Sequence, residues 1–171
     1  KVIYDAAHAF GVEVNGQSLL NFGDISTCSF HATKVFHTVE GGAIMVKDSL
    51  LSDQIYWQRM FGHKGDIYKY LGINAKNSEM HAAMGLCVLP KVKKIIEKRK
   101  ALSEYYDQLL NWKVLFKPNS IQDIKYNFAY FPVLFQSENQ LIKVTQALNK
   151  LDIFPRRYFY PSLNTLPFVN G

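Results

Sequence analysis

The stretch SFHATKVFHTVEGGAI, residues 29–44, places one lysine, Lys34, in a segment typical of strand, tight turn and strand. The first strand is expected to end near Phe30, and Gly41-Gly42 marks a tight entry into the next one. Because lysines are rarely buried, an ordinary role for Lys34 is that of a surface-loop residue. The alternative is a reactive amine, which needs neighbouring groups that fix its position.

Acidic and hydroxyl side chains lie upstream of this lysine. Val2-Ile3-Tyr4 is expected to form a short buried strand that ends at Asp5. In α/β folds ligands bind at the carboxyl ends of strands, so Asp5 stands where a site would lie. A helix N-cap is its more ordinary role. Ser29 is either a plain strand residue or a hydroxyl ligand of a phosphate.

Taken together, Lys34, Asp5 and Ser29 favour a cofactor site over three unrelated roles. A Schiff-base lysine is the usual anchor of pyridoxal phosphate. That cofactor also needs a carboxylate to keep its ring nitrogen protonated, and hydroxyl and backbone N–H donors for its phosphate.

The remaining chain alternates strand and helix signals. Asn15-Gly16 predicts a two-residue hairpin turn. Strands are expected at residues 25–30, 41–48 and 126–135, and helices at 48–61, 78–89, 90–110 and 138–151. Residues 63–77 are expected to be a polar loop. The pattern indicates an α/β fold followed by a smaller α+β part.

Composition narrows the class of protein. The 171 residues are 48% hydrophobic, enough for one compact domain or parts of two. The net charge of +6 suits an anionic substrate, and part of it lies in KVKKIIEKRK, residues 91–100. We expect a solvated helix face there; nucleic-acid binding is the weaker alternative, because no aromatic residues are interleaved.

Two cysteines, Cys28 and Cys87, lack a CxxC spacing and are expected to be buried free thiols in a reducing cytoplasm. No apolar run is long enough to span a membrane, and residues 1–10 lack the apolar core of a signal peptide. Because the chain opens on a strand, we expect it to be the latter part of a longer protein. A metal site built from Asp5, His8, His31 and His37 is not favoured, since their spacing matches no metal-binding motif.

The motifs DAAHA (5–9), SFHATK (29–34) and EGGAI (40–44) together resemble the DegT/DnrJ/EryC1/StrS family of sugar-nucleotide aminotransferases. GINAKNSEMHAAMGL (72–86) and YFYPSLNTLPF (158–168) are similar to later segments of that family. The resemblance covers most of the chain. It implies the fold-type I, aspartate-aminotransferase-like architecture, with the latter part of the large cofactor domain at 1–100 and the start of a small domain at 101–171.

The resemblance also implies roles for single residues. Lys34 would form the Schiff base with pyridoxal 5'-phosphate and move the proton. Asp5 would pair with the ring nitrogen, His8 would contact the 3-hydroxyl or the ring, and Ser29 would bind the phosphate. Asn74 would reach the phosphate of the cofactor bound in the neighbouring subunit, because family active sites are shared across a homodimer.

Substrate contacts are less specific. His31, together with Glu40-Gly41-Gly42, would shape the lysine loop, and an ordinary strand histidine is an equal alternative for it. His63 lies in FGHKG, similar to a family loop that approaches substrate. Arg156 and Arg157 are candidates for the substrate diphosphate, with plain surface charge as the alternative.

The implied reaction transfers an amino group from glutamate, released as 2-oxoglutarate, to dTDP-4-keto-6-deoxyglucose. A dTDP-3-keto sugar is the alternative, as is a non-catalytic binding or dimerisation module. The implied setting is cytoplasmic deoxysugar biosynthesis for lipopolysaccharide O-antigen. The family often has Tyr-Arg-Met where this chain has Ala75-Lys76-Asn77, and often His where it has Asn164. Lys34 itself argues against the dehydrating variant of the family, in which His replaces the lysine.

Overall fold

A computed structural model describes residues 1–119 and 121–169. They form two compact units, one of Lys1–Leu109 with Asn119–Phe131, and one of Leu110–Pro118 with the chain from Pro132 on. The division at residue 100 that we expect of the whole protein stays a prediction, and residues 120, 170 and 171 of its second part lie outside the described residues.

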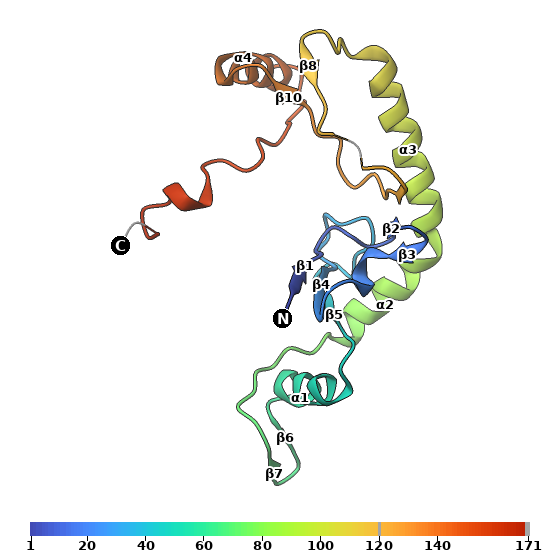
Figure 1. Cartoon of the computed structure of the whole chain (residues 1–171), viewed down its shortest axis with the longest axis vertical. Helices are drawn as coiled ribbons and strands as arrows, with labels where there is room; N and C mark the ends of the chain where they lie inside the picture. The colour runs from blue at the N-terminus through green and yellow to red at the C-terminus, as the bar shows by residue number, and fades with distance from the viewer. Residues whose placement is uncertain (120, 170–171) are drawn as a thin grey trace. The chain divides into compact units, whose positions relative to one another are not determined.

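A three-stranded sheet organises the first unit (Figure 1). Strand β1 (Ile3–Asp5) runs parallel to β4 (Ile25–Ser29), which pairs antiparallel with β5 (Gly42–Val46). In this register Asp5 lies opposite Thr27. Because β1 and β4 are parallel, their carboxyl ends meet at one edge of the sheet, as the position of Asp5 in the sequence predicts.

Strand β1 is where predicted, but the expectation that it is buried is wrong. Val2, Ile3 and Tyr4 are 51%, 66% and 48% exposed. The physical reason is that β1 is an edge strand, paired only with β4, and no described element covers its outward side chains. Apolar, β-branched composition identified the strand correctly but could not report what packs against it.

The connection from β1 to β4 contains no α-helix, which differs from the expected strand–helix alternation. It holds a hairpin of β2 (Glu13–Val14) and β3 (Gln17–Ser18), then the short 3₁₀ helix η1 (Leu19–Asn21). The hairpin turn is Asn15-Gly16, with φ of 50° and 74°, as predicted. Strand β9 (Ile124–Lys125) adds to β2 from a distant part of the chain.

The expected helices are present, and their ends follow from capping. Asp48 caps α1 (Ser49–Arg59), and its carboxylate accepts from the N–H groups of Leu50 and Leu51. Ser78 caps α2 (Glu79–Val88). The 3₁₀ turn η2 (Leu89–Lys91) carries the proline between α2 and α3 (Val92–Leu109).

Two segments differ from the sequence expectation. The predicted loop at 63–77 contains a hairpin of β6 (His63–Lys64) and β7 (Ile67–Tyr68), whose two-residue strands are too short for a period-2 signal. The predicted strand at 126–135 forms only at β10 (Leu134–Phe135). It fails earlier because Asn127 directs its amide to other backbone groups and Phe128 adopts a φ of 51°.

In the second unit, β10 pairs antiparallel with β8 (Leu115–Phe116). Helix α4 (Glu138–Asn149) follows where a helix was expected, and Ser137 caps it. The 3₁₀ helix η3 (Leu163–Thr165) lies in the last segment.

The core of the first unit lies beneath the segment that bears Lys34, residues 30–36. Val35, Phe36 and Val92 are buried together. Partly buried apolar side chains pack around them: Phe10, Phe30, Val88, Ile95, Ile96 and Ala129. Residues 30–36 thus pack against the start of α3.

Surface features follow the sequence with one exception. Residues 91–100 place Val92, Ile95 and Ile96 inward and their lysines outward, which confirms the solvated basic helix face. Cys28 is buried, but Cys87 is exposed, so the expectation of two buried thiols is wrong for Cys87. It lies on a part of α2 that no described residue covers. No helix in the described chain is both long and apolar enough to cross a membrane, and no cluster of three potential metal ligands occurs among the described residues.

The end of α1 offers a test of backbone packing. Gly62 has a φ of 77°, and a Cβ there would overlap the carbonyl oxygen of Tyr70. Gly65 has a φ of 58°, with nothing within 4 Å of its Cβ position. We expect Gly65→Ala to cost about 1 kcal/mol of unfolding free energy from backbone strain alone, and Gly62→Ala to cost about 1–3 kcal/mol more from the clash. Urea denaturation of both variants measures the difference, and equal losses would contradict this packing.

Candidate active site

Residues 30–41, called the lysine loop below, form a closed loop between β4 and β5. The N–H of Phe30 donates to the carbonyl of Gly41 at 2.8 Å, and the N–H of Thr38 donates to the carbonyl of Phe30 at 2.9 Å. Within it, the N–H of Lys34 donates to the carbonyl of His31 at 2.9 Å. The backbone of Lys34 is therefore held in a turn just beyond the carboxyl end of β4.

His31 braces this loop from the outside. Its Nδ1 lies 3.2 Å from the N–H of Thr33, which donates to it, and 2.9 Å from the Thr33 hydroxyl. Its Nε2 lies 3.6 Å from a carboxylate oxygen of Glu40. The ring thus links the two sides of the loop; whether it also contacts substrate stays a prediction.

The two glycines after Glu40 have different reasons to lack a side chain. Gly41 has a φ of 150°, and a Cβ there would overlap the hydroxyl of Thr38 and lie 3.2 Å from the side-chain amide oxygen of Asn77. A Cβ on Gly42 would lie 2.8 Å from the carbonyl oxygen of Cys28 on the neighbouring strand. The Gly-Gly turn is therefore required by close backbone approach, not only by its sharpness.

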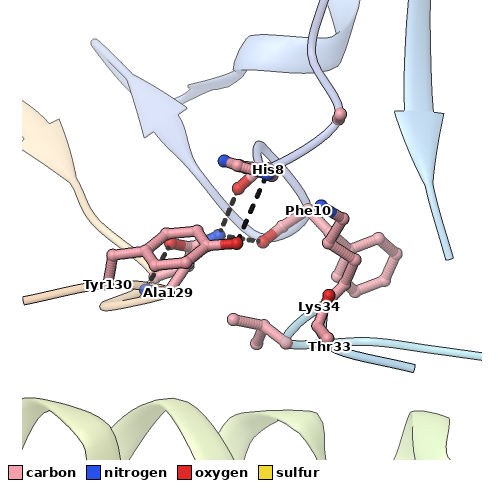
Figure 2. Close-up of a pocket in the computed structure, with 9 residues that line it drawn as sticks. His8, Phe10, Thr33, Lys34, Ala129 and Tyr130 are labelled. Atoms are coloured by element: carbon pink, nitrogen blue, oxygen red, sulfur yellow. Dashed lines mark hydrogen bonds between the residues drawn. The ribbon is translucent and has the colours of Figure 1, made fainter. Parts of the chain in front are cut away.

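A small recess opens beside Lys34 (Figure 2). Its walls come from the turn after β1, the lysine loop and the segment after β9. The lining residues are Ala7, His8, Phe10, Thr33, Lys34, Val35, Asn127, Ala129 and Tyr130. The structure thus brings two of the predicted cofactor residues, Lys34 and His8, to one recess.

His8 meets Tyr130 on the wall of the recess. Their ring centroids are 4.8 Å apart, and the Tyr130 hydroxyl lies 3.4 Å from His8 Nε2. Burial lowers the pKa of His8, the Lys34 cation lowers it further, and the Asp5 carboxylate raises it in part. The neutral imidazole is thereby favoured, and the charges of Lys34 and Asp5 both act on this ring.

Asp5 and Ser29 lie at the same edge of the sheet but do not line the recess. Asp5 is exposed at the end of β1, and its Oδ1 accepts from the N–H of Ala7 at 3.1 Å. Ser29 ends β4, and its hydroxyl accepts from the N–H of His31 at 3.3 Å. Their roles toward a cofactor stay predictions.

The other candidates lie elsewhere. Asn74 forms an isolated bridge with Met60 after α1. His63 stacks on Tyr68 in the β6–β7 hairpin, with ring centroids 4.8 Å apart. Neither residue lines the recess. Both were predicted to act on a partner's cofactor or on substrate, which the geometry of one chain does not test.

Arg156 and Arg157 belong to the second unit. Arg157 donates to a carboxylate oxygen of Glu138 at 2.7 Å and lies 3.4 Å from the ring centroid of Tyr160. Arg156 lies 5.8 Å from the ring centroid of Tyr158. Both guanidinium groups thus have aromatic contacts, and their role toward a diphosphate stays a prediction.

Sequence reasoning missed several contributors to the recess, among them Phe10, Asn127 and Tyr130. Asn127 and Tyr130 fall within the strand expected at 126–135. A polar amide inside this stretch was the available signal, since Asn is depleted in strands and is buried only where it is hydrogen-bonded.

The chemical groups present fit pyridoxal phosphate. That cofactor carries an aldehyde, a basic ring nitrogen beside a hydroxyl, and a phosphate. The chain offers an amine on Lys34 and an imidazole on His8 within one recess, and a carboxylate on Asp5 and a hydroxyl on Ser29 at the adjoining edge of the sheet. Each group of the cofactor thus has a partner of matching chemistry.

The charges around His8 give a signed prediction. Its pKa should lie below the ordinary value of about 6.5; Lys34→Gln should raise it and Asp5→Asn should lower it further. Because the folded-state pKa is depressed, the unfolded chain binds more protons, so the free energy of unfolding should fall as the pH drops through about 6.5. NMR titration of ¹³C-labelled histidine measures the shifts, with His8→Gln assigning the resonance. A lower His8 pKa in Lys34→Gln, or a higher one in Asp5→Asn, would contradict this arrangement.

Comparison with known proteins gives consistent results. A dTDP-4-amino-4,6-dideoxy-D-glucose transaminase of Shigella dysenteriae is 42% identical over 166 residues, covering 94% of this chain and 45% of the relative. A UDP-4-amino-4,6-dideoxy-N-acetyl-beta-L-altrosamine transaminase of Helicobacter pylori is 30% identical over 92% of this chain and 44% of the relative. The chain therefore spans about half the length of the curated relatives it matches.

The fold agrees with that of a solved aminotransferase, TlmJ from Streptoalloteichus hindustanus, with a TM-score of 0.89 at 19% identity over 99% of this chain and 47% of that one. The expected fold-type I α/β architecture is thereby confirmed. Residues 1–171 match the DegT/DnrJ/EryC1/StrS aminotransferase family throughout. The chain therefore belongs to this family of pyridoxal-phosphate-dependent aminotransferases.

Proposed function

We propose that the chain supplies the lysine and much of the cofactor site of an aminotransferase acting on a nucleotide-linked keto-deoxysugar. The observation that carries this is the placement of Lys34 in the recess with His8, beside the sheet edge that bears Asp5 and Ser29. A half-buried lysine in a hydrogen-bonded loop has the fixed position that a reactive amine needs.

Each group has a distinct task in this proposal. Asp5 would hold a proton on the ring nitrogen, and the Ser29 hydroxyl would donate to the phosphate. His8, kept neutral by burial and by Lys34, would hydrogen-bond the 3-hydroxyl. When bound, the cofactor withdraws electrons from the carbon that bears the amino group. Lys34 Nζ would then move the proton to and from that carbon as general base and acid.

We propose dTDP-4-keto-6-deoxyglucose as the amino acceptor and glutamate as the donor. The name of the Shigella dysenteriae relative supports both the dTDP group and amination at carbon 4. The Helicobacter pylori relative is named for a UDP-linked sugar aminated at the same carbon, so family membership alone leaves the nucleotide open. The 3-keto sugar is the runner-up. The reaction would serve deoxysugar and O-antigen biosynthesis in the cytoplasm.

Lys34→Ala tests the chemistry. In the whole protein with added pyridoxal phosphate, we expect an absorbance band near ~420 nm and glutamate-dependent amination of the 4-keto sugar, measured by product mass. Lys34→Ala should abolish both, because no other residue supplies the amine. The matched control is Lys47→Ala, which removes an exposed lysine beyond β5 and should leave both unchanged.

Three outcomes would overturn parts of this proposal. A band without amination of either keto sugar would reject the substrate class, and preference for the 3-keto sugar would reject the carbon. A wild-type protein with neither band nor product would support a non-catalytic binding or dimerisation module.

We further propose a homodimer in which Asn74 serves the partner's cofactor site. Asn74 is exposed and held by its bridge to Met60 outside the recess of its own chain. Lys34→Ala and Asn74→Ala should each be inactive or nearly so. If the sites are shared, mixing the two after subunit exchange should restore up to about a quarter of wild-type activity, since a mixed dimer retains one intact site.

The control for the mixing experiment is a pair in which neither chain supplies the lysine amine. Lys34→Ala mixed with the double variant Lys34→Ala, Asn74→Ala should recover nothing. Failure of the first mixture, with exchange verified by mass, would place Asn74 in its own subunit's site or outside any site.

A further inference from the structure

Asn127 is a buried polar residue that none of the roles above uses. Its side chain is 1% exposed and lies on the wall of the recess. Its Nδ2 donates to the carbonyl of His8 and to the carbonyl of Phe10, both at 2.8 Å, and its Oδ1 accepts from the N–H of Ala129 at 3.1 Å. One amide therefore ties the turn after β1 to a segment almost 120 residues further along the chain.

Only an amide side chain can make this set of bonds. It offers two N–H donors and one carbonyl acceptor, and all three groups are engaged here. A carboxylate of the same shape would present oxygen to two carbonyl oxygens, and an aliphatic side chain would leave both carbonyls without this donor. A buried polar group left unpaired is unfavourable, so the choice of Asn is specific.

The turn that Asn127 holds contacts both the segment after β9 and the lysine loop. On one side, His8 presents its ring to Tyr130 (Figure 2). On the other, Phe10 stacks on Phe36 with ring centroids 4.5 Å apart and meets Phe30 edge-on at 6.0 Å. Phe30 and Phe36 flank Lys34 in the sequence, so a shift of this turn would move both His8 and the support of the lysine.

The segment that bears Asn127 is itself fixed. Arg99 of α3 donates to the carbonyl of Ala129 at 3.0 Å. Phe128 has a φ of 51°, in the left-handed region, and Asn127 and Tyr130 on either side of it both line the recess. Asn127 therefore acts from a rigid base, as a positioning group must.

We propose that Asn127 is a positioning residue, which through the carbonyls of His8 and Phe10 holds the His8 imidazole against Tyr130 and facing the Lys34 side of the recess. This deepens the proposed function and rests on it for its catalytic consequence. The position of the imidazole itself is a property of the chain and can be measured without the cofactor.

The experiment compares Asn127→Leu with wild type in the whole protein. Without the amide, the turn should open and water should reach His8, so its pKa should rise toward the ordinary value; Asp5, Lys34 and Tyr130 are the titratable groups that face it and remain in place. ¹³C NMR titration of His8 in the cofactor-free protein measures this. In the loaded enzyme, kcat/KM should fall about 10- to 100-fold from misplacement of the site.

Ser26→Ala is the matched control. Ser26 is also 1% exposed and donates to a backbone carbonyl, that of Leu20, but it lies on β4 away from the recess. It should lower the free energy of unfolding without changing the His8 titration. If Asn127→Leu does not fold, Asn127→Ser, which is smaller and keeps one donor, replaces it and should shift His8 in the same direction.

An unchanged His8 titration in a folded Asn127 variant would overturn the proposal and leave Asn127 as an ordinary stabilising residue. A shifted titration with unchanged kcat/KM would overturn its catalytic part. Failure of the transaminase proposal is distinguishable, because it would appear as wild-type protein without amino transfer while the His8 titration still responds to Asn127.

Discussion

The packing of three phenylalanines beneath Lys34 is the interaction on which the site depends. Phe10, from the turn after β1, stacks on Phe36, and Phe30 meets both rings edge-on. Each such pair contributes about 0.5–1.5 kcal/mol beyond area burial. Because Phe30 and Phe36 precede and follow Lys34, the same contacts that form the core fix both ends of the lysine turn, and its amine is left at the recess.

The sheet supplies the second constraint. Parallel pairing of β1 and β4 brings Asp5 and Ser29 to one edge, and the turn after β1 then crosses in front of the lysine loop. The connection between these strands holds a hairpin and a 3₁₀ turn in place of an α-helix. Pairing of that hairpin with β9 delivers the segment of Asn127 and Tyr130 to the recess. Backbone pairing thus places Asn127 beside His8, although the two residues are almost 120 positions apart in the sequence.

Helix starts and tight turns could be predicted from the sequence, because a few neighbouring residues determine them. The helices expected at 48–61, 78–89 and 138–151 begin within one residue of the expected positions, and in the structure Asp48, Ser78 and Ser137 cap them by bonding to N–H groups two or three residues on. Asn15-Gly16 predicted its turn by the φ angles that these residues tolerate. Lys34, Asp5 and Ser29 were predicted from motifs whose order along the chain resembles a family pattern, and their roles toward a cofactor stay predictions.

Features with distant causes were not predictable in this way. The exposure of Ile3 depends on what packs on an edge strand, which its own composition does not record. The strand expected at 126–135 is replaced by irregular backbone because Asn127 bonds to carbonyls of a remote turn. Cys87 lies on an apolar helix that looked buried from its sequence yet is exposed.

Two residues that depart from the family pattern, Lys76 and Asn77, have separate contacts in the structure. Asn77, where the family often has Met, directs its amide to within 3.2–3.3 Å of the position a Cβ of Gly41 would occupy. Gly41 stands at the end of the lysine loop, and its carbonyl closes the loop by accepting from the N–H of Phe30. The substituted residue therefore lies beside Gly41 at the base of the lysine loop. Lys76, beside it, lies 4.1 Å from the ring centroid of Phe61, so its charge is directed to the turn between α1 and β6. The two neighbours thus act on different parts of the structure, and their departures need separate explanations.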